Sequence, residues 1–451
     1  MRLDALGNPV TVEDEQALAG VDDFVLGFLA YERRAEHIIA AADAAPDCSI
    51  ANCYAGMLWM LLEAPEAPQR AAQYLTAAER TASSATLREQ MNVALLRAWA
   101  DDDLPRATRT AQQIAEEFPH DLTVVKLHQY FDFNRGDFTG MLRSALRVRE
   151  ANRDIAYIHG MTAFAYEQCH LLDDAERSAH RALELQRKEP WAQHALAHVY
   201  LTRGLIEDGA WFLEGVADTW TGLNSFMVTH LWWHLALFYL SQGRNEEVLT
   251  LYDQHCWGVV KSYSQDQVGA VSLLTRMELA GIDVGDRWQD LGEHLRARAN
   301  DTVQPFLTLQ YLYGLARAKR PESEQLLEAT HERARSAPEF VRSTWAEVAL
   351  PAAEGLVAYA HEDFTTARRH LSLALPRMSE TGGSHAQRDL YEQILLDARI
   401  RSGELNLAQQ QLELRRSADP LSVPINTALA TLYDALDLPF EAQRARARLD
   451  E

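Results

Sequence analysis

Four histidines in the middle of the chain have a spacing that could support chemistry. His194 and His198 are four residues apart in WAQHALAHV, and His230 and His234 are four apart in HLWWH, which begins 32 residues after His198. On a helix, residues four apart occupy the same face. Imidazoles on one face can bind a metal ion, or act as general acids and bases near neutral pH. We therefore predict these four histidines as the candidate catalytic residues.

Metal binding and acid–base catalysis remain alternatives for this group. A catalytic zinc ion takes three protein ligands and keeps one open position, and His194, His198 and His230 could supply those three. In the HExxH motif of metalloproteases a glutamate follows the first histidine, whereas Ala195 follows His194 here. The cofactor therefore stays undetermined, with a divalent metal such as zinc as one option. A third alternative is that the histidines are core residues of their helices.

Composition and motifs exclude other classes. The net charge of −22 argues against nucleic acid and against an anionic membrane surface as partners. No apolar run approaches the roughly 20 residues that span a bilayer, and the acidic N-terminus does not resemble a signal peptide, so we expect a cytoplasmic protein. Nucleotide-binding, nucleophile-elbow and CxxC motifs are absent from the sequence. The four cysteines are too few for a disulfide framework.

The elements that must position the histidines are helices. Apolar residues recur at i, i+3, i+4 and i+7 along most of the 451 residues, and turn residues interrupt them about every fifteen residues. Such segments predict helical hairpins, and a shared frame repeats at 34 residues. The first copy is Ala163, Tyr166, His170, Ala175, Ala179 and Ala182; the second is Ala197, Tyr200, Gly204, Gly209, Leu213 and Val216; the third starts at Ala236, displaced by a five-residue insertion in TWTGLNSFM.

This frame is typical of tetratricopeptide repeats. We predict an all-α, tetratricopeptide-like α-solenoid of eleven or twelve hairpins, in which each hairpin packs on the next to form one continuous core. A strongly curved superhelix is expected at this repeat count, and ring closure is an open question. Residues 1–45 are expected to form an N-terminal cap with a helix over 22–44, and residues 46–451 a single repeat domain.

The repeat frame also predicts which side chains face the concave surface. In the central hairpins, residues 154–257, the predicted concave residues with polar or aromatic side chains are Tyr157, Phe164, Glu167, Trp191, His194, His198, His230 and Trp233. His234 falls nearer a seam between hairpins. Asp253 and His255 lie on a second helix, where we expect them to support the histidines from behind.

A second motif, GGSHAQRD at 382–389, lies in the region 380–400 and reads as a loop followed by a helix start. Gly382 and Gly383 permit positive φ, and Ser384 is a candidate helix cap. Backbone N–H groups there, together with Arg388, would suit a carboxylate or phosphate; the alternative is that these polar residues only pair with neighbouring helices. The candidate ligand-binding residues of this segment are His385, Gln387, Arg388 and Asp389.

Several segments resemble the tetratricopeptide-repeat protein 38 family over almost the whole chain. They are REQMNVALLRAWADDD, YIHGMTAFAYEQ, WAQHALAHVYLTRGLIEDGAWFLE, HLWWHLAL, GAVSLLTRMELAGIDVGDRW and GGSHAQRD. The resemblance implies a helical-repeat fold and a site at the polar motif residues, but no particular reaction. Asn92, Gln168 and Gln310 depart from the family's pattern and could mean a changed ligand.

Two functions follow as competing hypotheses. The first is a pocket for a small polar or anionic ligand, with hydrolytic or acid–base chemistry by the histidines and Arg388 as an anion clamp. The second is a non-catalytic scaffold that binds a protein or peptide along the concave groove. Histidine and tryptophan concentrated in two or three repeats favour the pocket. Whether the protein is an enzyme, and whether it forms a homodimer, stays open at this level.

Overall fold

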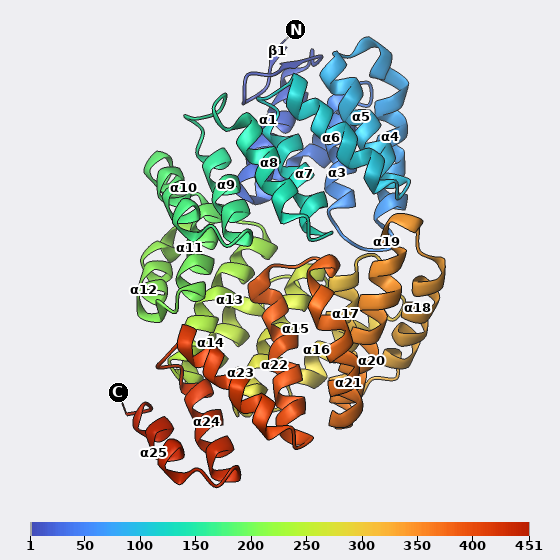
Figure 1. Cartoon of the computed structure of the whole chain (residues 1–451). Coiled ribbons are helices and arrows are strands. Elements are labelled where there is room, and N and C mark those ends of the chain that lie inside the picture. Colours follow the sequence, from blue (N-terminus) through green and yellow to red (C-terminus); the bar gives the residue numbers. More distant parts are fainter. Residues whose placement is uncertain (1, 451) are drawn as a thin grey trace. The chain divides into compact units, whose positions relative to one another are not determined.

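The computed structural model describes residues 2–450, which fold almost entirely into α-helices (Figure 1). The exception is a short antiparallel pair of strands near the N-terminus, β1 (Arg2–Leu3) and β2 (Pro9–Val10). Within residues 2–450, no helix is long and apolar enough to cross a membrane. The all-α prediction is confirmed.

The chain divides into two compact units, one with residues up to Leu196 and Asp218–Met227, the other with Ala197–Ala217 and residues from Val228 on. The first unit contains α1 (Glu15–Ala30), η1 (Arg33–Glu36), α2 (His37–Ala44), α3 (Ser49–Met60), α4 (Ala67–Thr81), η2 (Ala82–Ser84), α5 (Leu87–Ala100), α6 (Leu104–Glu117), α7 (Leu122–Phe133), α8 (Phe138–Arg149), α9 (Ala156–Gln168) and α10 (Leu172–Leu185). The division passes through α11 (Pro190–Thr202), η3 (Ala217–Thr219) and α13 (Ser225–Ser241). Whether residues 46–451 behave as a single domain stays a prediction.

The second unit contains the remaining elements. They are α12 (Ile206–Val216), α14 (Asn245–Leu251), the π-helical turn η4 (Tyr252–Cys256), α15 (Ser264–Leu279), α16 (Arg287–Leu295), η5 (Arg296–Arg298), α17 (Pro305–Arg317), α18 (Glu322–Ser336), α19 (Glu339–Thr344), the π-helical turn η6 (Trp345–Ala349), α20 (Leu350–Ala360), α21 (Phe364–Ala374), η7 (Leu375–Thr381), α22 (His385–Arg401), α23 (Leu405–Ala418), α24 (Val423–Ala435) and α25 (Pro439–Ala447). Because α19, η6 and α20 follow one another without a break, they act as the first helix of one hairpin.

Successive helices pair into twelve hairpins along residues 2–450, in agreement with the predicted eleven or twelve. Each turn between paired helices contains at least one residue with φ between 55° and 86°. They are Tyr31, Glu63, Asp102, Gly136, His170, Gly204, Gly243, Gly281, Lys319, Glu362, Gly403 and Asp437, with Gly285 as a second in the turn between α15 and α16. A left-handed residue ends a helix and lets the next N–H bond to a carbonyl one turn back. Leu205 donates in this way to the carbonyl of Tyr200 at 2.9 Å.

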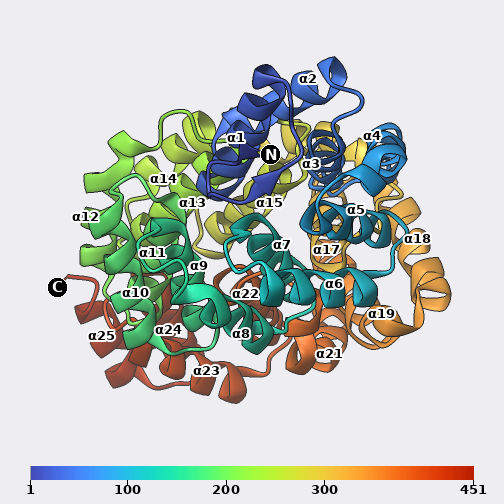
Figure 2. The ribbon, with the colours of Figure 1, turned by 90° about the horizontal axis from the view of Figure 1, so that it is seen from above.

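The packing within and between hairpins follows the predicted frame. The crossing residues Ala163, Ala197 and Ala236 are completely buried. A methyl group added at Gly209 would lie 2.3 Å from the Phe238 ring, which explains a small residue there. Figure 2 shows hairpins α3–α4 and α5–α6 of the first unit lying beside each other.

The predicted helix over 22–44 is wrong. The chain instead forms two helices, because α1 ends at Ala30 and Tyr31 takes the left-handed conformation. The two helices pack closely, since a methyl group added at Gly20 would lie 2.2 Å from Cβ of Ala41. Residues 15–44 are therefore a complete hairpin and not one helix closing a hairpin.

Part of the family-like motif at 88–103 has a structural role. The buried Arg88 guanidinium donates to Asp121 at 2.7 Å and lies 3.5 Å from Asp4 in the N-terminal segment. Asn92, which departs from the family's pattern, donates to the same Asp121 carboxylate at 3.2 Å. These contacts attach the N-terminal segment to α5 and α7.

Candidate metal centre

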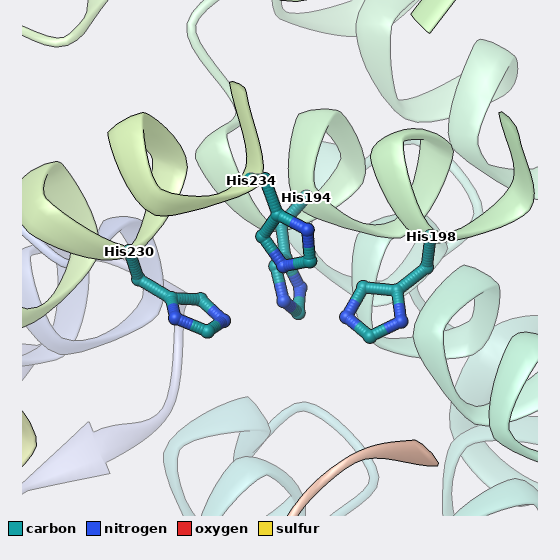
Figure 3. A group of neighbouring side chains, drawn as sticks. All are labelled: His194, His198, His230 and His234. Carbon is teal, nitrogen blue, oxygen red and sulfur yellow. The ribbon is translucent and has the colours of Figure 1, made fainter. Parts of the chain in front are cut away.

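Helices α11 and α13 point four histidine rings toward one another (Figure 3). His194 and His198 are one turn apart on α11, and His230 and His234 are one turn apart on α13. One ring nitrogen from each histidine lies within 4.8 Å of the corresponding nitrogens of the other three. The side chains that spacing alone had singled out thus form one cluster, in which α11 fixes His194 relative to His198.

The rings of the second unit are in direct contact. The centroid of the His234 ring lies 4.6 Å from that of His198 and 4.7 Å from that of His230. His234, which we expected nearer a seam, therefore contacts both of its neighbours in the cluster. The ring planes of His230 and His234 are inclined at 82°, so the two imidazoles meet edge to face.

All four histidines are buried, although the repeat frame predicted side chains along a groove open to solvent. Burial, together with the neighbouring His198, lowers the pKa of His230 to about 3. His230 is therefore neutral at physiological pH, the state in which imidazole binds metal ions.

Tryptophan rings hold two of the imidazoles in place. In the first unit, Trp191 stacks on His194 with centroids 4.4 Å apart, and Phe164 lies 5.0 Å from the same imidazole. In the second unit, Trp233 stacks on His230 at 5.2 Å and 8°. Both tryptophans were predicted as ligand-binding residues, and in the structure they orient the histidines.

The start of α11 is fixed by a buried carboxylate. Glu189 accepts a hydrogen bond from the backbone N–H of Ala192 in the first turn. The carboxylate lies so close to Gly160 of α9 that an added methyl group there would be 2.3 Å from Oε2. A glycine at position 160 therefore makes room for the carboxylate that caps the histidine helix.

The segment 382–389 approaches the histidines within the second unit. The ring of His385 lies 5.2 Å from that of His198. Arg276 of α15 donates to the carbonyl of Ala386, 110 residues later, at 2.7 Å. Figure 1 shows α15 and α22 side by side, as this bond requires. The sequence had left open whether this segment meets the histidines.

The polar side chains of that segment have partners of their own. Ser384 and Gln387 form a capping box at the start of α22. Arg388 donates to the carbonyl of Gly383 in the same loop, and Asp389 pairs with Arg415 of α23 at 2.7 Å. Burial opposes ionisation of Asp389, but Arg415 outweighs it and lowers the pKa of this carboxyl group. These pairings favour the structural alternative for Arg388 and Asp389 over an anion clamp.

The supporting role expected of Asp253 and His255 stays a prediction, and both side chains contact other partners. Asp253 forms an exposed ion pair with Arg287 at 2.7 Å. His255 stacks on Trp232 of α13 with centroids 4.2 Å apart, and burial lowers its pKa. The π-helical turn η4 directs both side chains to these partners instead of to the four histidines.

Two further predicted residues, Tyr157 and Glu167, lie on α9 in the first unit and are buried. Burial raises the pKa of the Tyr157 phenol, so it stays protonated. Glu167 accepts a hydrogen bond from Gln168 at 2.6 Å. A ligand-binding role for either residue stays a prediction.

A cavity adjoins the cluster inside the second unit. It is lined by His230, Trp233, Gln387, Ser272 and Gly269, among others, and has a volume of ≈ 10 Å³. That volume holds about one water molecule. A methyl group added at Gly269 would meet no atom within 4 Å, so this glycine leaves part of the space open.

Arg276 is the residue that the sequence analysis missed. The guanidinium is buried, lies 5.3 Å from the centre of the Trp233 ring and bonds to the Ser272 hydroxyl at 2.5 Å. Burial lowers its pKa to about 10, and Asp389 opposes that shift, so it stays charged at neutral pH. The sequence shows Arg276 only as an arginine in the helical motif GAVSLLTRMELAGIDVGDRW. An arginine on a helix is usually exposed, so the sequence did not indicate that it would be buried.

No family model matches the chain. Among solved structures, the human IFIT1 dimer with m7Gppp-AAAA is 12% identical, covers 97% of this chain and 95% of its own, and has a TM-score of 0.41. The human IFIT1 dimer with PPP-AAAA is 12% identical over 97% and 94% of the two chains, with a TM-score of 0.40. A monomeric mutant of IFIT1 with Gppp-AAAA is 12% identical over 96% and 95% of the two chains, with a TM-score of 0.39.

These likenesses are too distant to carry an argument about function. Membership of the tetratricopeptide-repeat protein 38 family, and a cytoplasmic location, stay predictions. The helices themselves establish the coarser assignment, which is an all-α array of tetratricopeptide-like hairpins.

Proposed function

We propose that His194, His198, His230 and His234 bind a divalent transition-metal ion at the centre of a site for a small polar or anionic ligand. One observation carries the proposal: four buried imidazoles from two helices each offer a ring nitrogen within 4.8 Å of the others. Burying four polar imidazoles costs more desolvation free energy than burying apolar side chains of similar size. A bound metal ion would compensate that cost.

The donor set favours zinc or a related ion. Imidazole suits zinc, copper, iron and nickel, whereas magnesium and calcium require oxygen ligands. Zinc binds histidine nitrogens at about 2.0–2.1 Å in a tetrahedron, so nitrogens that lie within 4.8 Å of one another would have to move closer together around the ion. Trp191 stacks on His194 and Trp233 stacks on His230, so these two imidazoles would move mainly within the planes of their rings.

Hydrolysis is the reaction that this environment supports best. A bound zinc ion lowers the pKa of its water ligand to about 7 and thereby supplies a nucleophile. The ≈ 10 Å³ cavity beside His230 has room for such a water, and Gln387 and Ser272 offer hydrogen bonds there. The buried charge of Arg276 favours a substrate with negative or strongly polar groups. Three histidines would then hold the ion, and the fourth could accept a proton.

Metal analysis after purification and zinc loading tests the proposal. We expect about one zinc per chain for the native protein and a higher melting temperature with zinc than with chelator, because a ligand that binds only the folded state stabilises it. The double variant His198→Gln, His234→Gln should retain no stoichiometric zinc and show no shift. Glutamine keeps the polarity and much of the volume of the histidines.

His255→Gln is the matched control, since His255 lies near the cluster but stacks on Trp232. It should bind zinc like the native chain. Circular dichroism establishes whether each variant is folded. A folded native protein that neither retains zinc nor gains stability from it would contradict the proposal, as would equal zinc in the double variant.

The alternative function is a protein-interaction scaffold, and exposed aromatic side chains favour it. Trp211 on α12 is 76% exposed and Phe440 on α25 is 70% exposed. Large apolar side chains in such positions often mark contact surfaces. The zinc experiment separates the two functions, because a scaffold of this kind does not require metal at the buried histidines.

A further inference from the structure

A second cavity lies in the first unit, in the groove where α6 and α8 of neighbouring hairpins meet over α7. Its volume is ≈ 140 Å³. That is about ten times the roughly 10–15 Å³ needed for one water molecule. The cavity can therefore hold a small molecule or the end group of a larger one. None of its lining residues belongs to the histidine cluster.

Two buried polar atoms at this cavity lack partners among residues 2–450. They are Nδ1 of His128, on α7, and the hydroxyl oxygen of Thr108, on α6. The His128 side chain is only 10% exposed, and its other nitrogen lies 3.5 Å from Asp132. Leaving a buried polar atom without a hydrogen bond costs about 1–3 kcal/mol. Both atoms would regain a bond if a polar ligand occupied the cavity.

Three arginines line the same space. Arg135 pairs with Asp132 at 2.8 Å, and Arg147 pairs with Glu116. Arg143 is held more loosely, since its nearest carboxylate oxygen, on Asp137, is 3.6 Å away. The Arg143 side chain is 69% exposed and can change rotamer at little cost. Its guanidinium is therefore the group best placed to change partners.

The charges create a positive potential where His128 sits. Burial and the charges of Arg135, Arg147 and Arg143 together lower the pKa of His128 to about 4, with Asp137 acting in the opposite direction. Burial also raises the pKa of Asp132 to about 6, against the pull of Arg135. Among the residues that line the cavity, Arg135, Arg143 and Arg147 face two carboxylates, Asp132 and Asp137, so the lining carries one more positive than negative charge.

We propose that this cavity binds an oxyanion, a phosphate or carboxylate group, with Arg143, Thr108 and His128 as its direct partners and Arg135 and Arg147 as flanking charges. Guanidinium groups pair with both anions through parallel N–H bonds. A hydroxyl and an imidazole nitrogen complete the contacts from the buried side. The ligand would be a small phosphorylated or carboxylated molecule whose remaining part extends through the exposed mouth at Arg143.

Calorimetric titration of the metal-free, full-length protein with inorganic phosphate, and separately with acetate, tests this inference. We expect saturable binding of one of these anions at one site per chain. Arg143→Gln should weaken binding about tenfold or more, the contribution of a charge-assisted hydrogen bond. Thr108→Val should weaken it as well. Phosphate binding alone would identify a phosphorylated ligand, and acetate binding alone a carboxylated one.

Arg177→Gln provides the control, because Arg177 is also 69% exposed and paired with an aspartate, Asp174, but lies on α10 away from the cavity. Its anion affinity should equal that of the native chain. The inference is overturned if neither anion binds saturably, or if Arg143→Gln and Arg177→Gln weaken binding equally. Chelator in all solutions keeps the result independent of the histidine cluster.

Discussion

Glu189 is a buried carboxyl group whose surroundings determine both its charge and the position of α11. Burial raises its pKa to about 7, although the Ala192 N–H and the ammonium of Lys126 lower it. Lys126 is buried too and donates to the carbonyl of Leu29 at 3.1 Å. This carboxyl group sits at the cap of the helix that carries His194 and His198, so its ionisation bears on the candidate metal centre.

The shifted pKa of Glu189 predicts a pH-dependent stability. An unfolded glutamate titrates near its ordinary 4.5, so between that pH and about 7 the folded chain binds more protons and loses stability as the pH rises. Glu189→Gln removes this titration. We expect the variant's free energy of unfolding, relative to the native chain, to rise by about 2–3 kcal/mol between pH 5 and pH 8.

Urea denaturation at the two pH values measures this difference. Glu184→Gln is the matched control, since Glu184 lies on the exposed surface of α10 and should show no such change. A Glu189→Gln difference that is the same at both pH values would show that the carboxyl group titrates normally.

The hairpin turns are the elements on which the fold depends. Each contains at least one left-handed residue, and the spacing of Asp102, Gly136, His170 and Gly204 is constant at 34 residues. Where glycine occupies this position, the left-handed conformation causes no steric clash, because glycine has no Cβ atom. Residues such as His170 and Lys319 adopt it with a side chain present, which is why the turns could not all be located from glycine alone.

Glycine-to-alanine changes at two sites should act in opposite directions. At Gly403, φ is 86° and an added methyl group meets no atom within 4 Å, so Gly403→Ala should cost about 1–2 kcal/mol through backbone strain alone. At Gly215, within α12, an added methyl group also meets no atom within 4 Å. Gly215→Ala should stabilise the chain by about 0.5–1 kcal/mol through helix propensity.

Urea midpoints of the two variants measure these effects. A stabilising Gly403→Ala would contradict the left-handed conformation of the turn between α22 and α23, and a destabilising Gly215→Ala would contradict the expected gain in helix propensity.

At the scale of the whole molecule, charge limits the choice of partners. The net charge of −22 repels polyanions over distances of about a Debye length, ~8 Å at physiological salt. The proposed oxyanion cavity would take a small anion through Arg143, Thr108 and His128, without the basic surface that a nucleic-acid backbone needs. Binding of small phosphates and binding of RNA are therefore separate questions for this chain.

We expect no RNA binding tighter than about 100 μM at physiological salt, since even nonspecific complexes need a basic surface to displace counterions. Fluorescence anisotropy with a labelled single-stranded RNA bearing a 5′-triphosphate measures this. The same RNA with a 5′-hydroxyl is the control for end-specific recognition. Saturable binding in the micromolar range would contradict the prediction.

The sequence by itself determined the all-α repeat architecture, the crossing residues such as Ala163 and Ala197, and the four candidate histidines. These features are local: helical periodicity, a 34-residue repeat and an i, i+4 spacing are set by backbone geometry and by contacts between neighbouring hairpins. The sequence did not predict the helix break at Tyr31, because tyrosine has no preference for the left-handed conformation that it adopts there.

Only the tertiary structure decided which polar side chains meet. Arg276 and the Ala386 carbonyl are 110 residues apart, and the contact of His385 with His198 bridges a still longer separation. Periodicity predicts the face of a helix but not the partner opposite it. For the same reason Asp253, Arg388 and Asp389 were assigned to a site by type and spacing. In the folded chain Asp253 pairs with Arg287, Asp389 pairs with Arg415, and Arg388 donates to the Gly383 carbonyl.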